Sequence, residues 1–170
     1  IHARALREII MPTVKGMAAD GILFTGFLYA GLMISEDGKV KTLEFNCRMG
    51  DPETQPIMSR MKSDFLVALD AAVDGKLDQV ELEWDPRIAL GVVMAAHNYP
   101  ETPRKGDAIT GIPDDGPDHV TFHAGTSMDN GTLKTSGGRV LCVVGLDHTT
   151  RGDRKSTRLN SSHGYISYAV

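Results

Sequence analysis

The sequence is poor in the residues that mark several common protein classes. Its 170 residues include one tryptophan and two cysteines, Cys47 and Cys142. Two cysteines make no disulfide framework, which excludes a disulfide-stapled secreted domain and fits a reducing cytoplasm. Neither cysteine has a nearby histidine or basic cluster to activate its thiol, so we expect both to be small core residues.

Long apolar runs and an excess of positive charge are also missing. The longest apolar candidate, 22–34, is interrupted by threonine and glycine and is shorter than the roughly 18 residues that span a bilayer. The chain has 18 basic and 22 acidic residues, a formal net charge of −4, whereas nucleic-acid-binding domains usually carry a basic excess or a basic face. We therefore expect a soluble, cytoplasmic protein with no nucleic-acid partner and no membrane partner.

The C-terminal stretch differs in kind from the rest of the chain. Residues 154–170 hold three basic residues, no acidic ones and a polar run in the middle, and they resemble a translated adapter or vector read-through. We predict that 153–170 is a non-native tail, the alternative being a native disordered terminus. Without those three basic residues the net charge would fall from −4 to −7, which strengthens the case against a nucleic-acid partner.

The first part of the chain predicts two short helices followed by a β-hairpin. Residues 6–10 carry one apolar face of a helix that we expect to be interrupted at Pro12, and a second short helix ends at Gly21. Two strand-like runs follow, 24–34 and 39–45. The Asp-Gly pair between these runs is a strong hairpin signal.

A longer helix is predicted after a polar loop. Apolar residues recur at every fourth position from Ile57 to Val73, which is the spacing of an amphipathic helix. Proline is favoured at the first position of a helix and glycine just past its end. We therefore predict one helix that begins at Pro56 and ends at Gly75.

The second half of the chain predicts a small β-rich unit. A polar connector, 76–88, contains Asp85 and Arg87, which we interpret as an ion pair of the connector. Short apolar runs then alternate with glycine and proline turns, a pattern typical of a small barrel or sandwich of strands. These runs are 89–96, 108–112, 119–124 and 139–146.

The polar segment that starts at Glu44 carries the candidate chemistry. Side chains alternate along a strand, so Glu44 and Asn46 point to the same face. A carboxylate and an amide oxygen placed together can share Mg²⁺, which needs oxygen ligands and takes only one or two carboxylates from the protein. Arg48 follows at the strand end, where its donors can meet a phosphate or a carboxylate. A divalent ion with an arginine is typical of phosphoryl transfer, although a Glu-x-Asn pair alone is most often a solvated face.

Several motifs together resemble one enzyme family. In the order in which they occur, they are 14–17, 25–33, 44–55, 61–64, 91–96, 122–126 and 137–141. They are similar to the phosphoribosylamine–glycine ligases (glycinamide ribonucleotide synthetases), the purine-pathway family of the ATP-grasp superfamily. The resemblance covers about residues 1–150.

The resemblance implies an α+β chain in two parts. These are the second subdomain of an ATP-grasp fold over 1–75 and, after the connector, a truncated β-rich domain of barrel-sandwich type over 89–152. It also implies a cytoplasmic, monomeric ligase that joins glycine to 5-phosphoribosylamine through a glycyl phosphate. ATP is then the cosubstrate, and Mg²⁺ or Mn²⁺ bridges the nucleotide phosphates.

The resemblance also assigns roles to individual residues. Glu44 and Asn46 match the family's metal-ligand positions, and Arg48 matches a position that faces phosphate or the acyl phosphate. Asp51 and Glu53 are expected to contact the amine or the ribose of the substrate, with loop solvation and helix capping equally open. No residue is assigned to ATP, because the sequence lacks a glycine-rich phosphate loop with a lysine.

Two alternatives to this function remain open at the sequence level. The first is another ATP-grasp carboxylate–amine ligase or a carboxylase subunit, which the loop 50–55 disfavours. The second is a non-catalytic binding module resembling a carrier domain, which lacks here the exposed hairpin-tip lysine of such domains. Under the preferred hypothesis the chain is a C-terminal fragment of about 153 native residues that is inactive by itself.

Overall fold

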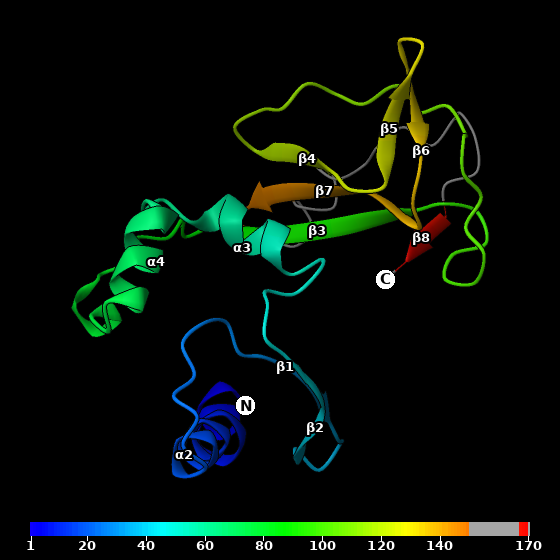
Figure 1. Cartoon of the computed structure of the whole chain (residues 1–170). Coiled ribbons are helices and arrows are strands. Elements are labelled where there is room, and N and C mark those ends of the chain that lie inside the picture. Colours follow the sequence, from blue (N-terminus) through cyan, green and yellow to red (C-terminus); the bar gives the residue numbers. More distant parts are fainter. Residues whose placement is uncertain (150–166, 170) are drawn as a thin grey trace. The chain divides into compact units, whose positions relative to one another are not determined.

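The computed structural model describes residues 1–149 and 167–169, and it has the predicted α+β composition (Figure 1). Within this described part of the chain, no helix is long and apolar enough to cross a membrane. The tail predicted over 153–170 lies outside the described residues, apart from the short strand β8 (Ser167–Ala169).

The chain divides into two compact units. The first unit consists of 1–50 and 64–81, and the second consists of 51–63 and the chain from residue 82 onward. The predicted connector 76–88 is thus shared between the two units. The domain bounds that the sequence indicates stay a prediction.

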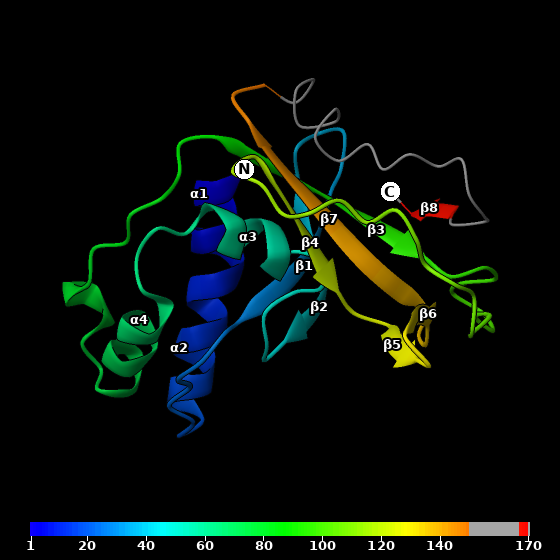
Figure 2. The same ribbon diagram turned by 90° about the horizontal axis from the view of Figure 1, so that it is seen from above.

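One run of helix opens the first unit. Helix α1 (His2–Ala5) continues through a π-helical turn, Leu6–Ile10, into α2 (Met11–Ala19) (Figure 2). The predicted interruption at Pro12 is therefore wrong. Proline cannot donate a backbone hydrogen bond, and its ring crowds the carbonyl group one turn earlier. The wider π-helical turn directly before Pro12 accommodates this defect, so the chain stays helical.

Glycines end two helices of the first unit at the predicted positions. Beyond α2, Gly21 has a φ of +80°, its N–H donates to Ala18 O at 3.1 Å, and Ile22 N–H donates to Met17 O at 2.9 Å. Beyond α4 (Phe65–Val73), Gly75 has a φ of +69° and closes the same pattern of bonds. This paired closure satisfies carbonyls at the helix end and requires a left-handed residue, which glycine adopts without strain.

The predicted hairpin is confirmed. Strands β1 (Tyr29–Ile34) and β2 (Val40–Asn46) pair antiparallel, and Gly38 in the turn has a φ of +76°. The first strand begins at Tyr29, five residues later than predicted, because Gly26 adopts a φ of +145° that breaks the extended run. A register shift follows Gly31, which lies opposite Glu44.

The single helix predicted from Pro56 to Gly75 is two helices. Helix α3 (Thr54–Arg60) ends at Met61, whose backbone is extended and forms a bridge with Trp84. Lys62 N–H then donates to Glu83 O at 3.0 Å. Helix α4 begins directly after Asp64, whose carboxylate accepts the Leu66 N–H at 2.8 Å, as an N-cap residue does. The four-residue apolar spacing continues across the break. The helix is divided there because residues 61–62 pair with residues 83–84. A 3₁₀ turn, Leu77–Gln79, follows α4.

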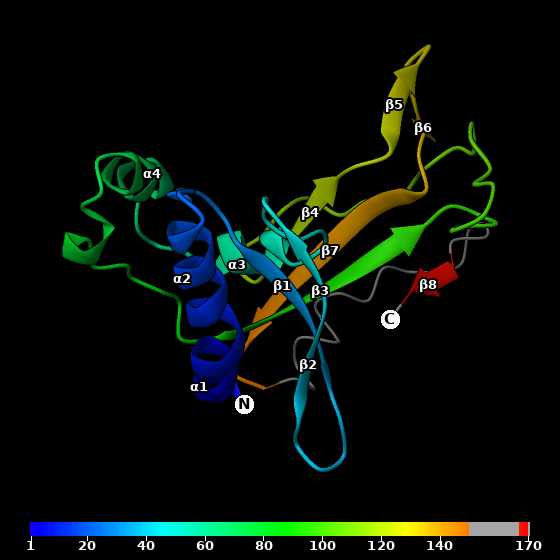
Figure 3. The same cartoon turned by 60° about the horizontal axis from the view of Figure 1, so that its bottom comes forward.

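An antiparallel sheet forms the core of the second unit, in the order β4-β7-β3-β8. Besides the short β8, its strands are β3 (Ile88–Ala95), β4 (His119–His123) and β7 (Arg139–Asp147), and β3 and β7 are the longest pair (Figure 3). The stretch 140–144 of β7 is at most 2% exposed, so the strand is buried on both faces. Helix α3 packs on this sheet at Gly91, where a Cβ atom would lie 2.8 Å from Pro56 Cγ.

A second hairpin was not predicted. Strands β5 (Thr126–Asp129) and β6 (Thr132–Thr135) pair antiparallel around Asn130 and Gly131, both with positive φ. The Asn-Gly pair is a strong turn signal, so the sequence contained this information. The predicted run 108–112 forms only an isolated bridge between Ala108 and Lys134.

Candidate metal and substrate site

Strand β2 places Glu44 and Asn46 side by side. Asn46 Nδ2 donates a hydrogen bond to Glu44 Oε1 at 3.2 Å, so the two side chains share one face of the hairpin, as alternation along the strand predicts. Gly31 faces Glu44 across the hairpin, and a Cβ atom there would lie 3.1 Å from Glu44 Cγ. Glycine on β1 therefore leaves the space that the Glu44 side chain uses.

The Glu44–Asn46 pair fits a hard cation that receives further ligands from elsewhere. Rotation of the Asn46 amide would present Oδ1 in place of Nδ2 beside the Glu44 carboxylate, which gives two oxygen ligands. Among the residues that the structure describes, no group of three acidic, histidine or cysteine side chains could hold a metal. Mg²⁺ commonly keeps waters and substrate phosphates beside one or two protein carboxylates, so two protein oxygens suit such an ion.

Arg48 follows β2 on an exposed stretch of the first unit. Its Nη1 donates to Met49 O at 2.9 Å. A guanidinium carries five N–H donors in a rigid fork, so this bond leaves donors that can meet an anion. The side chain has the position, directly beyond the Glu44–Asn46 strand, that the sequence predicts.

Asp51 and Glu53 lie in the second unit, at the start of α3. Asp51 Oδ1 accepts a hydrogen bond from Gln55 Nε2 at 3.2 Å, and Asp51 Oδ2 lies 3.1 Å from Arg139 Nη1. Glu53 precedes the first helical residue, and its carbonyl accepts the Ile57 N–H at 3.3 Å. Glu44, Asn46 and Arg48 thus lie in the first unit, and Asp51 and Glu53 lie in the second.

Two family models match the chain in succession. The description "Phosphoribosylglycinamide synthetase, ATP-grasp (A) domain" matches residues 1–54, and "Phosphoribosylglycinamide synthetase, C domain" matches residues 89–163. The second match extends into the segment predicted as a tail, whose origin stays a prediction.

Individual proteins agree with the family models. A phosphoribosylamine–glycine ligase of Ralstonia nicotianae is 69% identical over 156 residues, which is 92% of this chain and 37% of that protein. One from Neisseria meningitidis is 60% identical over 147 residues, 86% of this chain and 35% of that protein. The crystal structure of the Thermotoga maritima phosphoribosylamine–glycine ligase matches with a TM-score of 0.78 at 33% identity, and covers 98% of this chain and 40% of that one.

The chain belongs to the phosphoribosylglycinamide synthetase family. The sequence-based resemblance is thereby confirmed. The chain spans a little over a third of the length of the curated relatives that it matches. The Glu44–Asn46 pair lies within the match to the synthetase's ATP-grasp domain, and the sheet of the second unit lies within the match to its C domain.

The two cysteines of the chain differ in environment. Cys142 is buried in β7, as predicted, and burial together with the charge of Asp51 raises the pKa of its thiol to about 11. Cys47 is exposed, so its predicted place in the core is wrong. It follows directly on Asn46, the last residue of β2, which is also where the pairing with β1 ends.

The sequence predicted the ion pair of Asp85 with Arg87 and did not predict the contact of Arg139 with Asp51. Arg87 Nη2 lies 2.9 Å from Asp85 Oδ2, which confirms the predicted pair. Hydrogen bonds from the Arg87 side chain, and then from its backbone N–H, hold the pKa of Asp85 well below its usual range. The contact of Arg139 with Asp51 was missed. The motif that contains Arg139 is part of the resemblance, but 88 residues separate the two partners.

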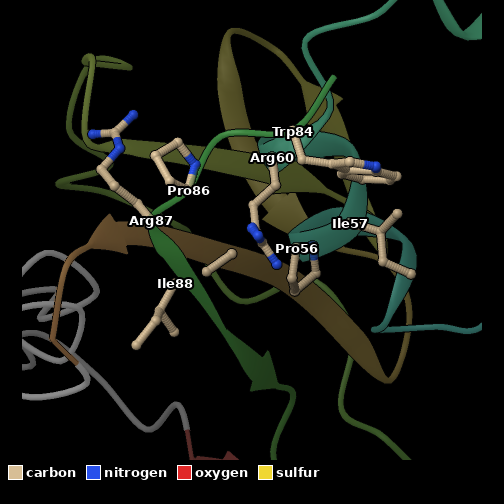
Figure 4. Close-up of a pocket in the computed structure, with 8 residues that line it drawn as sticks. Pro56, Ile57, Arg60, Trp84, Pro86, Arg87 and Ile88 are labelled. Atoms are coloured by element: carbon tan, nitrogen blue, oxygen red, sulfur yellow. The ribbon is translucent and has the colours of Figure 1, made fainter. Parts of the chain in front are cut away.

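An open pocket of about 680 Å³ lies elsewhere in the second unit (Figure 4). Its lining residues are Pro56, Ile57, Arg60, Trp84, Pro86, Arg87, Ile88 and Ala89. Arg60 Nε and Nη2 both donate to Asp85 O, at 3.1 and 3.0 Å, so this guanidinium joins the end of α3 to the segment before β3. None of the predicted site residues lines this pocket.

Proposed function

We propose that this chain is part of a ligase that joins glycine to 5-phosphoribosylamine at the expense of ATP. The products are glycinamide ribonucleotide, ADP and phosphate. The observation that carries the proposal is the Glu44–Asn46 pair, hydrogen-bonded on one strand face within the segment that matches the ATP-grasp domain. The activity is that of a full-length ligase, and this chain spans 37% of the length of the Ralstonia nicotianae relative.

The proposed reaction has two steps. A carboxylate oxygen of glycine attacks the terminal phosphorus of ATP, the bond from that phosphorus to the bridging oxygen breaks, and ADP leaves. The amine nitrogen of phosphoribosylamine then attacks the acyl carbon of glycyl phosphate. Phosphate leaves with the bonding electron pair, and the nitrogen loses a proton. In both steps a nucleophile approaches a group that carries negatively charged phosphate. The protein therefore supplies charge neutralisation and positioning.

Each predicted residue has a place in this scheme. Glu44 and Asn46 hold Mg²⁺ or Mn²⁺, which when bound neutralises charge on the nucleotide phosphates. The Arg48 fork binds the phosphate or the acyl phosphate. Asp51 and Glu53 bind the amine or the ribose hydroxyls of the second substrate.

The proposed architecture follows the two family matches. Residues 1–75 belong to the second ATP-grasp subdomain, and residues 89–152 belong to a truncated β-rich domain of barrel-sandwich type. We assign no residue of this chain to ATP itself. We further propose a cytoplasmic, monomeric enzyme with small-molecule partners.

The decisive test uses a chimera in which this chain replaces the matching segment of the Ralstonia nicotianae ligase. Glu44→Gln removes one charged ligand and keeps the shape of the side chain. We expect glycine-dependent ADP release to fall at least about 100-fold and to need more Mg²⁺, since loss of even outer-shell partners of a metal costs 10–100-fold. Glu36→Gln, in the turn of the same hairpin, is the matched control and should change neither quantity.

The outcomes separate the alternatives. Unchanged Mg²⁺ dependence in Glu44→Gln would remove the ligand assignment. ADP release that depends on bicarbonate instead of glycine would favour a carboxylase. A folded chimera without any ADP release would favour a binding module.

A further inference from the structure

Arg139 holds both the backbone and the side chain of Asp51. Arg139 Nη1 donates to Asp51 O and lies 3.1 Å from Asp51 Oδ2. Its Nε donates to the Tyr99 hydroxyl at 2.9 Å. One planar guanidinium therefore joins the loop before α3 to the segment after β3, within the second unit.

The backbone of Arg139 is itself fixed by close packing. Arg139 O accepts the Gly125 N–H at 2.9 Å, and a Cβ atom on Gly125 would lie 2.6 Å from Gly137 Cα. The ring of Tyr99 covers Gly138, where a Cβ atom would lie 2.5 Å from the ring. Glycines at these positions let three chain segments meet. The buried part of β7 begins at Val140, directly after Arg139. Arg139 thus projects from a rigid base.

Asp51 is held from two sides and remains accessible. One carboxylate oxygen accepts from Gln55 and the other faces Arg139. The Asp51 side chain is still about half exposed, and a carboxylate offers about four acceptor directions. The contacts therefore fix the orientation of the loop 51–55 and leave Asp51 able to accept a further donor.

We propose that Arg139 is a positioning residue for the amine substrate. It holds the loop 51–55 in the conformation in which Asp51 and Glu53 accept hydrogen bonds from the amine or ribose hydroxyls. This inference rests on the proposed function. Arg139 acts through Asp51 and does not touch the substrate.

The first experiment measures loop order in the chain itself, without any activity. Hydrogen exchange of the amides in 53–58 is compared among the unsubstituted chain, Arg139→Gln and Arg139→Lys. We expect Arg139→Gln to speed exchange there at least about fivefold, with Arg139→Lys intermediate, since lysine keeps the charge and loses the fork. Lys134→Gln, which removes an ion pair with Asp129 in the same unit, is the matched control and should leave 53–58 unchanged.

The second experiment measures kinetics in the chimera. In Arg139→Gln the KM for phosphoribosylamine should rise about tenfold, the effect of 1.4 kcal/mol, while kcat and the KM for ATP change less than about twofold. Arg139→Lys should recover part of this loss. Asp51→Asn should raise the same KM, and the double variant should be no worse than the poorer single variant, because coupled residues are not additive.

Each outcome decides the inference separately from the proposed function. Faster loop exchange with a raised amine KM supports it. Unchanged exchange with a raised KM would show that Arg139 contacts the substrate directly, and faster exchange with an unchanged KM would show that loop order serves no substrate; either result overturns the inference. If Arg139→Gln also speeds exchange in β3 and β7, exchange of the amides in 53–58 is compared instead among Arg139→Lys, Tyr99→Phe and Lys134→Gln. Faster exchange there in the first two variants than in Lys134→Gln supports the inference, and equal exchange overturns it. An inactive unsubstituted chimera bears on the function alone.

Discussion

Replacement of Gly125 by alanine tests the packing that supports Arg139. Gly125 lies just beyond β4, in a segment where its N–H donates to Arg139 O. An added Cβ atom would lie 2.6 Å from Gly137 Cα and 2.7 Å from Arg139 O. Both obstructing atoms belong to the backbone, so no side-chain rotation can relieve the overlap.

The size of the effect follows from these distances. Ordinary contacts of a Cβ atom are 3.4–4 Å, so the two backbones must separate by most of an ångström. Overpacking of a core typically costs 1–3 kcal/mol. We expect the upper end of this range, about 3 kcal/mol, because the strain falls on hydrogen-bonded backbone at the start of the most buried strand.

The single tryptophan of the chain provides the assay. Trp84 lies in the second unit, so its fluorescence during urea unfolding reports that unit. Gly125→Ala should lower the midpoint without changing the slope, as a change in stability does. Gly16→Ala, in α2 where no atom lies within 4 Å of the added Cβ, is the matched control. It should leave the Trp84 transition unchanged and raise the stability of the helix by about 0.5–1 kcal/mol, read by circular dichroism.

One result would refute the reasoning. If Gly125→Ala changes the free energy of unfolding of the second unit by less than about 0.5 kcal/mol, a size typical of neutral surface changes, the close approach of the two backbones is not a constraint. The packing argument for a rigid Arg139 would then fail with it.

Two further predictions concern ionisable groups. At pH 8 a thiol reagent should modify Cys47 rapidly, because it is exposed, whereas Cys142, whose pKa is raised to about 11, should react only after unfolding; two fast thiols would contradict the assignment. Asp85→Asn should lower the melting temperature at neutral pH, since it removes the ion pair with Arg87. The pKa of Asp85 is depressed in the folded state, so its contribution is present above the unfolded value of about 3.9 and declines as the pH falls below it. The difference between Asp85→Asn and the unsubstituted chain should therefore narrow in strong acid, and a constant difference would contradict this origin.

Local sequence signals predicted the features that need only neighbouring residues. The Asp-Gly turn defined the β1–β2 hairpin, and Gly21 and Gly75 ended helices where expected, because a turn or a helix end is closed by bonds within a few residues. The shared face of Glu44 and Asn46 follows in the same way from the alternation of side chains along a strand. The placement of Glu44 beside Asn46 was therefore predictable from the sequence, and the metal role of the pair stays a proposal.

Contacts between distant segments decided the rest. The spacing from Ile57 to Val73 is that of one helix, but backbone pairing of Met61 and Lys62 with 83–84 divides it. Asp51 and Glu53 read as a polar loop, and nothing in the sequence indicates which partner holds them. The hold of Arg139 on Asp51 spans 88 residues and exists only because β7 and three close-packed glycines bring the segments together.

The sequence by itself thus determined the turns, the helix ends, the strand faces and the family. Tertiary structure alone decided where a regular pattern is interrupted and which side chains meet across the fold, because those depend on long-range packing that no local pattern encodes.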